Sequence, residues 1–577
     1  MVVLRRPPSP VGDYGGTKLS LLLEKQHNRG QDGAGAAILS DHPSPGETPY
    51  WIAKSASASP LVDILGALAK RVPTKDFERI FLGHLRYATF GKNNTTFCHP
   101  FVHEASDLAH TLLLAGNFNL TNTSELFEDY STHGSFPTSK ADGYLITELI
   151  SKELACGKGL SESIASALAD ADGAWTLCGM TGDGWAFATR DPHGIRPGFY
   201  YVDDNVVVVA SERPAIQAAF DVPPAAVKEL PPGEALIVTP AGEVQMSKLS
   251  SDKPTPRPCA FERIYFSRAN DADVHRERKA LGAALLPQIL EAANAPLEDI
   301  FFSYIPNSAR IAFHGLLEGM FKQILSPQES SQSCQKTLCA SASPREISLP
   351  RFGEVIVKDA KFRTFIADAG ARREFYKHIY DVTYGLVRPG RDTLVVLDDS
   401  IVRGNTMKNA ILPMLDRLGP KRVVIASSAP PIRYPDCYGI DMSTLGELVA
   451  FRALVNLLGP SAEAELRAAM AGRAVPNAPN DPLASLYARF SDAEHCAEIA
   501  RLLTPPNMKA EVVVVYQTVP NLRKCLLPPP PSSTLPPFHS STLGDWYFTG
   551  DYPTPGGYKV LHNALLNYLE KRNDRSY

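Results

Sequence analysis

The chain has 577 residues, of which 44% are hydrophobic and 21% are charged, a composition typical of globular proteins. This length exceeds what one ordinary hydrophobic core organises, so we expect two or three domains. The formal net charge of −4 argues against a general nucleic-acid binder. No apolar run approaches the roughly 18 residues that cross a membrane, and we expect no membrane partner.

The cysteines and the N-terminal segment indicate the cellular compartment of the protein. The segment MVVLRRPPSP lacks the apolar core of a secretory signal. The nine cysteines are odd in number and form no C-x-x-C pair, which predicts reduced thiols in a cytoplasmic protein. Two segments, 326–350 and 527–537, are rich in Ser and Gln or in Pro, and we interpret them as an insertion and a linker.

The first 250 residues alternate between strand and helix patterns, and four motifs in them could form a site for a small polar substrate. A short helix is expected at Leu19–Lys25, before the turn-rich run HNRGQDG. The Arg86 guanidinium could donate two parallel hydrogen bonds to a carboxylate, and the Asn117 side-chain amide could stabilise an oxyanion. From the residues alone, an arginine such as Arg86 near a strand end is more often a surface charge, and Asp142 could also be a helix N-cap, a role that does not exclude binding. The motifs read HNRGQDG (27–33), GHLRYAT (83–89), AGNFNLTN (115–122) and KADGY (140–144).

Together these motifs resemble glutamine amidotransferases with the N-terminal-nucleophile (Ntn) hydrolase fold, an αββα sandwich of the α+β class. The resemblance implies that Arg86 binds the α-carboxylate of glutamine and Asp142 its α-ammonium. It also implies an oxyanion hole formed by the Asn117 side chain and the Phe118 backbone N–H. The chain departs from the family pattern in two places, because Asn28 is an extra residue and Phe118 stands where glycine is usual.

The nucleophile of this family is a cysteine at the mature N-terminus, whose own α-amine serves as the base. This chain begins with Met1 and Val2, which resembles the strand directly after that cysteine. The catalytic cysteine is therefore absent, and Cys98, Cys156 and Cys178 lack a free amine. Two explanations stay open: the true start lies upstream, which we favour, or the glutaminase half is inactive.

From Cys259 the pattern changes to apolar strands followed by small-residue turns and helices. The clearest example is TLVVLDDSIVRGNT, in which a buried strand at Thr393–Leu397 ends in Asp398 and Asp399. The next turn and helix N-terminus suit a phosphate, while the two carboxylates suit ribose hydroxyls or Mg²⁺. The alternative is an ordinary strand-to-helix turn with a solvated acidic pair. The helix that follows should bury one face, formed by Met407, Ala410, Ile411, Met414, Leu415 and Leu418.

The DDSIVRGNT string resembles the phosphoribosyl pyrophosphate (PRPP) loop of type I phosphoribosyltransferases. The segment from Ser427 to Met442, with SAPPI and YGIDM, resembles one family of them, the glutamine PRPP amidotransferases. This implies an α/β second domain with a basic flexible loop at Lys361, Arg363 and Thr364, and Mg²⁺ near Ser308, Asp398 and Asp399. The implied PRPP-binding residues are Asp398, Asp399, Ser400, Arg403, Gly404, Asn405 and Thr406.

The resemblance implies a glutaminase domain at 1–250, a transferase domain at 259–520, and a Pro-rich linker and tail at 521–577. Ammonia from glutamine would attack PRPP to give 5-phosphoribosylamine, the first step of purine biosynthesis, in a homo-oligomer inhibited by purine nucleotides. Some members hold a [4Fe–4S] cluster, but only Cys259 and Cys437 match its ligands, so we expect none. Two alternatives remain: an ammonia-dependent transferase with an inactive glutaminase domain, and a non-catalytic PRPP-sensing regulator.

Overall fold

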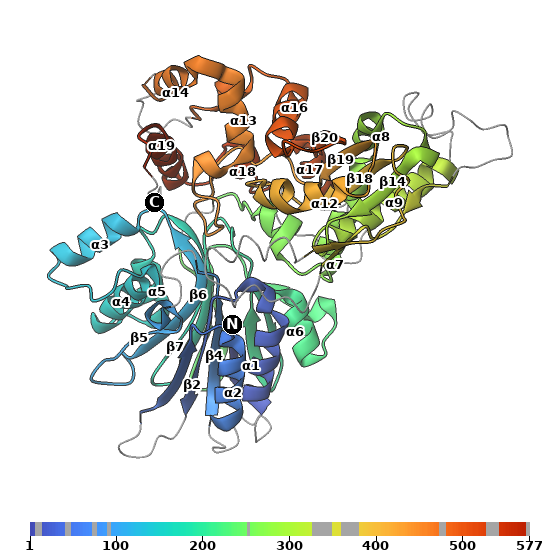
Figure 1. The fold of residues 1–577 in the computed structure, drawn as a ribbon. Helices are drawn as coiled ribbons and strands as arrows, with labels where there is room; N and C mark the ends of the chain where they lie inside the picture. The colour runs from blue at the N-terminus through green and yellow to red at the C-terminus, as the bar shows by residue number, and fades with distance from the viewer. Residues whose placement is uncertain are drawn as a thin grey trace.

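The computed structural model describes residues 1–5, 14–40, 48–71, 78–88, 94–250, 254–325, 349–358, 380–471, 481–526 and 542–572. Figure 1 shows two parts, a layered β sandwich built by the first half of the chain and an α/β part built by the second. Most of the predicted insertion at 326–350 and all of the predicted linker at 527–537 lie outside the described residues. Among the described helices, none combines the length and apolarity needed to cross a membrane.

The sandwich contains two antiparallel sheets of seven and six strands. The order of the first is β11-β9-β10-β1-β4-β2-β3, and that of the second is β13-β12-β8-β7-β6-β5. The first comprises β1 Val2–Arg5, β2 Gly33–Ser40, β3 Tyr50–Ser55, β4 Glu78–Arg86, β9 Phe199–Val202, β10 Val206–Ala210 and β11 Lys228–Glu229. The second comprises β5 Phe101–His103, β6 Leu112–Leu120, β7 Gly173–Thr181, β8 Ala186–Arg190, β12 Glu234–Val238 and β13 Val244–Lys248.

Alternation along the strands explains the four layers. In β1, Val2 and Leu4 pack between the sheets, whereas Val3 packs on the outer face against helices, because successive strand residues point to opposite faces. The αββα arrangement confirms the predicted fold. The first sheet is covered by α1 Tyr14–Lys25, α2 Pro60–Arg71 and α6 Arg213–Phe220, and the second by α4 Asp142–Ala155 and α5 Leu160–Ala167, beside α3 Thr123–Thr132.

The second part is organised by a five-stranded parallel sheet in the order β15-β14-β18-β19-β20. Its central strand β18 is buried on both faces, which explains why Thr393–Leu397 is an almost continuous apolar run. This parallel sheet with helices on both faces confirms the predicted α/β class. The strands are β14 Ile300–Tyr304, β15 Arg351–Phe352, β18 Thr393–Asp398, β19 Arg422–Ser427 and β20 Glu511–Tyr516, with a separate hairpin of β16 Ile356–Lys358 and β17 Tyr380–Val382.

Helices pack on both faces of this sheet. On one face lie α8 Leu286–Ala293 and α9 Arg310–Leu325, and on the other η10 Met407–Ile411, α12 Leu412–Asp416 and α16 Asp492–Leu503. The six residues predicted to form the buried face of the helix after the acidic pair are all buried. The π-helical geometry of its first turns was not predicted. Smaller elements are η3 Thr95–Phe97, η4 Pro224–Ala226, η6 Leu297–Asp299, η11 Leu445–Glu447, η12 Gly459–Ser461 and α15 Ala484–Tyr487.

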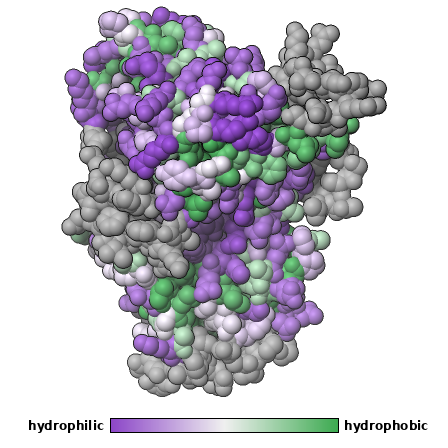
Figure 2. Space-filling model, turned by 45° about the vertical axis from the view of Figure 1, so that its right-hand side comes forward, coloured by the Kyte–Doolittle hydropathy of each residue, from purple (hydrophilic) through white to green (hydrophobic). Residues whose placement is uncertain are grey.

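The junction of the two parts has its own apolar core, which includes Ala174 and Ile195 from the sandwich, Tyr438 from the second part, and Trp546 near the end of the chain. The last helix is tied to the sandwich by Asp172, whose carboxylate accepts hydrogen bonds from the Gly556 N–H (3.0 Å) and the Thr554 hydroxyl (2.6 Å). The surrounding helices are η5 Glu262–Phe266, α7 Ala272–Ala284, α13 Val449–Leu458, α14 Ala462–Ala471, α17 Val519–Leu526, α18 Trp546–Thr549 and α19 Pro555–Leu569. The molecular surface is hollowed and mainly hydrophilic at the waist between the parts (Figure 2).

Candidate active sites

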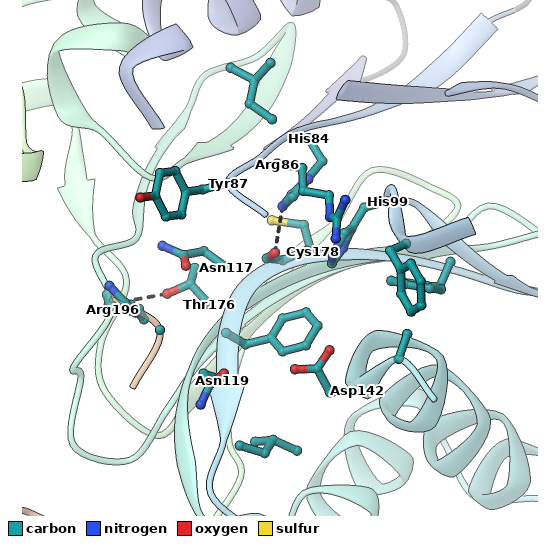
Figure 3. Close-up of a pocket in the computed structure, with 18 of the residues that line it drawn as sticks. His84, Arg86, Tyr87, His99, Asn117, Asn119, Asp142, Thr176, Cys178 and Arg196 are labelled. Carbon is teal, nitrogen blue, oxygen red and sulfur yellow. Dashed lines mark hydrogen bonds between the residues drawn. The ribbon is translucent and has the colours of Figure 1, made fainter. Parts of the chain in front are cut away.

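A cavity of about 860 Å³ lies at the end of the sandwich nearest the junction. The structure brings into its lining all four residues predicted for glutamine: Arg86, Asn117, Phe118 and Asp142 (Figure 3). Residues after the sandwich also line it, namely Glu262, Phe266 and Gly439. The cavity therefore extends from the amidotransferase-like motifs to the boundary between the two parts.

Arg86 ends β4, and the turn-rich motif that begins at His27 holds its backbone. The carbonyl of Arg86 accepts from the Asp32 N–H at 3.0 Å, and the Asp32 carboxylate accepts from the Ala88 N–H at 2.9 Å. The guanidinium lies 5.7 Å from the centre of the Phe97 ring, within cation–π range. These contacts place a rigid cation at the cavity wall, where a carboxylate would need it.

Asp142 is the first residue of α4, and Ala141 is the N-cap. The alternative prediction, that Asp142 is the N-cap of this helix, is therefore wrong by one position. The side chain still lies in the first turn, where the helix dipole favours its negative charge. It lines the cavity together with residues of β6, and one of its carboxylate oxygens accepts from the Gly143 N–H at 2.9 Å (Figure 3).

Strand β6 presents Asn117 and Phe118 in the middle of the cavity. The Gly116 N–H donates to His99 Nδ1 at 3.3 Å, and the Gly116 carbonyl accepts from His84 Nε2 at 2.9 Å. Both backbone groups of Gly116 therefore point away from β7. Because every second residue of a strand directs its backbone to the same side, the Phe118 N–H also points away from β7.

Two histidines behind this strand were not singled out from the sequence. His84 and His99 stack with ring centroids 3.9 Å apart, and His99 meets the Phe118 ring edge-on at 5.5 Å. Burial lowers the pKa of both, to about 3 for His84, so both rings are neutral at physiological pH. Their hydrogen bonds fix the position of Gly116, two residues before the predicted oxyanion donor. The only clue in the sequence is that a histidine two residues before Arg86 points to the same face of the strand.

Residue 1 lies at the cavity, where an N-terminal nucleophile would be needed. The Met1 amino group donates to the Gly83 carbonyl at 3.1 Å, and Met1 Sδ lies 3.5 Å from Gln26 Nε2. Cys178 lines the same cavity near that amino group, but burial raises the pKa of its thiol. The thiol is therefore protonated near neutral pH and is a poor nucleophile.

A second constellation forms where the parallel strands β14 and β18 end side by side. Asp398 and Asp399 close β18, and the Ser308 turn follows β14, so a Ser308 hydrogen bond reaches Asp399. Burial raises the pKa of both carboxyls; at Asp398 the neighbouring Asp399 raises it further, and at Asp399 the Ser308 and Ser400 hydroxyls oppose the rise. This crowded acidic pair would be stabilised by a cation or by hydroxyl donors.

The donor set fits Mg²⁺ shared with a ligand. Magnesium is usually held by one or two carboxylates together with substrate phosphates and water. In the described ranges no three His, Cys, Asp or Glu side chains gather around a point where a metal could bind. The coordination shell of Mg²⁺ would then come only in part from Asp398, Asp399 and the Ser308 hydroxyl, and the oxygens of a diphosphate would complete it.

The turn after the acidic pair is shaped for close approach of a ligand to its backbone. Gly404 has φ +76°, and a Cβ there would lie 2.3 Å from Leu503 Cδ2, so only glycine fits. Arg403 turns outward, donating to the Glu447 carboxylate at 2.6 Å and to the Asp441 carbonyl at 3.0 Å. A phosphate bound at this turn would therefore depend on the backbone amides of the helix start more than on the Arg403 charge.

The remaining predicted residues have different outcomes. Lys361, Arg363 and Thr364 of the predicted flexible loop lie outside the described residues. Cys259 and Cys437 are buried at the junction, and the Cys259 thiol lies 2.7 Å from the Tyr547 hydroxyl. A phenol against one of two thiols does not fit a cluster that needs four thiolates.

The fold and its two sites define a two-part enzyme class, in which a glutamine amidotransferase sandwich is joined to a phosphoribosyltransferase-type parallel sheet. Residues 99–218 match the family model described as a glutamine amidotransferase domain. Amidophosphoribosyltransferase from Bacillus subtilis is 31% identical over 376 residues, which cover 64% of this chain and 69% of that protein. The enzyme of the same name from Archaeoglobus fulgidus is 28% identical over 447 residues, covering 76% of this chain and 84% of that protein.

A solved structure agrees in fold along almost the whole chain. It is the glutamine PRPP amidotransferase of B. subtilis in complex with ADP and GMP. The TM-score is 0.67 at 23% identity, with 96% of this chain and 97% of that chain covered. The chain belongs to the amidophosphoribosyltransferase family, whose members are pentosyltransferases.

Proposed function

We propose that this chain forms 5-phosphoribosylamine from PRPP and ammonia, with glutamine as the ammonia source. The observation that carries the proposal is the meeting of Ser308, Asp398, Asp399 and the Gly404 turn at the carboxyl ends of neighbouring parallel strands. Ligands of open α/β sheets bind at this edge. The glutamine-type cavity reaches the same junction, which supports a shared task.

The proposed roles follow from the chemistry of each group. Ser400, Asn405 and Thr406 with the Gly404 backbone would hold the 5′-phosphate, beside Arg403, and the acidic pair would hold the ribose hydroxyls. Mg²⁺, when bound at the acidic pair and Ser308, would neutralise charge on the departing diphosphate. Ammonia would attack C1 of the ribose as the bond from C1 to the diphosphate oxygen breaks.

The predicted basic loop would complete the proposed site. Lys361, Arg363 and Thr364 would close over PRPP and exclude water, which otherwise competes with ammonia at C1. The basic residues of this loop favour an enzyme over a PRPP-sensing regulator, since closure serves chemistry more than binding.

We also propose how the enzyme is inhibited, whether it forms an oligomer and where in the cell it lies. The B. subtilis structure with ADP and GMP supports inhibition of this chain by purine nucleotides, and the family resemblance supports a homo-oligomer. The cysteines that the structure describes are all unpaired, which supports a cytoplasmic location.

The direct test is pyrophosphate release from PRPP and Mg²⁺, with ammonium chloride or glutamine as nitrogen donor. We expect activity with ammonia and its loss in Asp399→Asn, which keeps the shape of the side chain and removes the charge. Tight PRPP binding without release from either donor would instead support a regulator.

A second experiment tests the glutaminase half through position 1. In Met1→Cys, with the cysteine as the first residue of the mature chain, we expect glutamine-dependent activity to appear. Met1→Ala, the matched control, should leave only ammonia-dependent activity. A Met1→Cys enzyme that uses ammonia but not glutamine would show that the cavity around Arg86 and Asn117 is not a competent glutaminase site.

A further inference from the structure

The phenyl ring of Phe118 lines the glutamine-type cavity but has no part in the roles described so far. Those roles use only the backbone N–H of this residue, and glycine is usual at this position of the family pattern. Phe118 lies in β6 and is partly buried. Because an oxyanion hole needs no phenyl ring here, the contacts of the ring indicate what it adds to the site.

Two glycines make room for the Phe118 ring, one on its own strand and one on the neighbouring helix. Gly116 lies two residues earlier on the same face of β6, and a Cβ there would lie 3.0 Å from Phe118 Cδ1. Gly143 is the second residue of α4, and a Cβ there would lie 3.1 Å from Phe118 Cζ. The ring therefore fills the space between β6 and the first turn of α4, and its tip lies against the helix.

Neighbouring rings hold the Phe118 ring in this position. The His99 ring meets it edge-on at 5.5 Å, and the Phe101 ring meets His99 in the same way at 4.8 Å, a favourable geometry for aromatic pairs. His99 is itself fixed, because its Nδ1 accepts from the Gly116 N–H at 3.3 Å. Phe101 also packs against the start of α4, where a Cβ at Gly143 would lie 2.3 Å from Phe101 Cε2. The strand, these rings and the helix start therefore form one rigid wall of the cavity.

The two ends of the Phe118 ring coincide with the two ends of the proposed nitrogen donor. At the backbone end is the Phe118 N–H, the predicted hydrogen-bond donor to the oxyanion that forms at the side-chain amide of glutamine. At the tip is Gly143, which directly follows Asp142, the predicted partner of the α-ammonium. A glutamine held at both ends would have its two methylenes beside the ring, where burial of apolar surface stabilises them. Arg86 and Asp142 would bind the same charged groups in asparagine, so they cannot distinguish the two side-chain lengths.

We propose that the Phe118 ring determines which side-chain length the donor site accepts. The ring supports the two methylenes of L-glutamine, and by seating the start of α4 it sets the distance between the oxyanion donor and Asp142. L-Asparagine is one methylene shorter, so it reaches only one of these two ends. The inference deepens the proposed function and rests on glutamine as the nitrogen source. It assigns a specificity role to a side chain at a position where the family pattern has none.

The test is calorimetric titration of the full chain with L-glutamine and with L-asparagine, since binding needs no nucleophile. We expect the wild type to bind L-glutamine about tenfold or more tightly, the discrimination that one methylene gives in an apolar pocket. Phe118→Ala should weaken glutamine binding about tenfold and bring the two dissociation constants within about threefold of each other. Phe118→Met keeps a long apolar side chain and should hold their ratio within about threefold of the wild-type value. The control is Phe220→Ala, at a partly buried residue on the outer face of the other sheet, and it should leave the ratio unchanged.

An unchanged ratio in folded F118A would overturn the proposal, and so would a wild type that binds both amino acids equally well. Circular dichroism identifies the variants that have folded. If F118A does not fold, Phe118→Val takes its place with the same expected fall in the ratio, because a β-branched side chain suits a strand. A wild type that releases no pyrophosphate with ammonia would count against the proposed function alone, since the two dissociation constants still judge Phe118. A wild type that binds neither amino acid would contradict both this inference and glutamine as the nitrogen source.

Discussion

Replacing Glu262 should uncouple the two parts of the molecule. Its carboxylate, 4% exposed, accepts from Arg29 Nη1 at 2.9 and 2.7 Å and from Arg196 Nη1 at 3.1 Å. Both arginines belong to the sandwich and Glu262 to η5. Arg29 keeps a second acid in Glu212 (2.7 Å), but Arg196 has no other ion pair among the described residues. Glu262→Ala therefore leaves one buried guanidinium unpaired, which costs about 3–5 kcal/mol.

Urea unfolding followed by circular dichroism measures this cost. A chain of two parts need not unfold in one step. We therefore expect the Glu262→Ala variant to unfold in two transitions, the first of which has its midpoint at a lower urea concentration than the wild type. Glu262→Gln retains an acceptor and should lose less, about 1–3 kcal/mol. The matched control is Glu465→Gln, whose partner Arg489 is exposed, and its midpoint should stay close to that of the wild type. Equal losses in Glu262→Ala and in the control would refute the reasoning.

Three further predictions concern other features of the fold. The Gly404→Ala substitution should raise the KM for PRPP at least tenfold. Gly390 also has a positive φ but has open space around it, so the control Gly390→Ala should cost only about 1–2 kcal/mol of stability. Equal KM values in the two variants would contradict this prediction. Trp546→Ala should destabilise the junction by about 3–5 kcal/mol in urea unfolding, and a loss below 1 kcal/mol would show that this core does not hold the parts together. Because His84 has a pKa lowered from 6.5 to about 3, the unfolded chain binds more protons between these values, so stability is full above pH 6.5 and falls as pH drops. His84→Gln should flatten that slope, and an unchanged slope would mean that the ring is not buried in its neutral form.

The predictable part of the structure is local. The apolar run before Asp398 could be identified as a buried parallel strand because such strands are covered on both faces. The fold of each part followed from motif resemblance, and the glutamine-type residues do line one cavity. The direction of the Arg403 side chain was not predictable, because its acids Asp441 and Glu447 come from a segment about 40 residues away.

Contacts between distant segments were the least predictable. The pair of Arg29 and Glu262 joins residues 233 positions apart, and the motif that contains Arg29 gives no sign of this partner. The extra Asn28 looked like a small departure in a turn. In the structure it donates to the Glu212 carboxylate at 2.8 Å and to the Phe266 carbonyl at 3.1 Å, so the added residue links the sandwich to η5.

The attachment of the last helix to Asp172 has a consequence for how the protein is made. Residues 1–250 leave the ribosome long before Thr554 and Gly556, so the Asp172 carboxylate meets its partners only when synthesis is nearly complete. Until then the apolar junction residues that Trp546 covers stay exposed, and such surfaces promote aggregation. A stop codon after β20 (Glu511–Tyr516) and before residue 542 would therefore yield a chain with both β-sheet cores but an open apolar junction. We expect such a product to depend on chaperones or to be degraded, even though every proposed substrate-binding residue has already been synthesised.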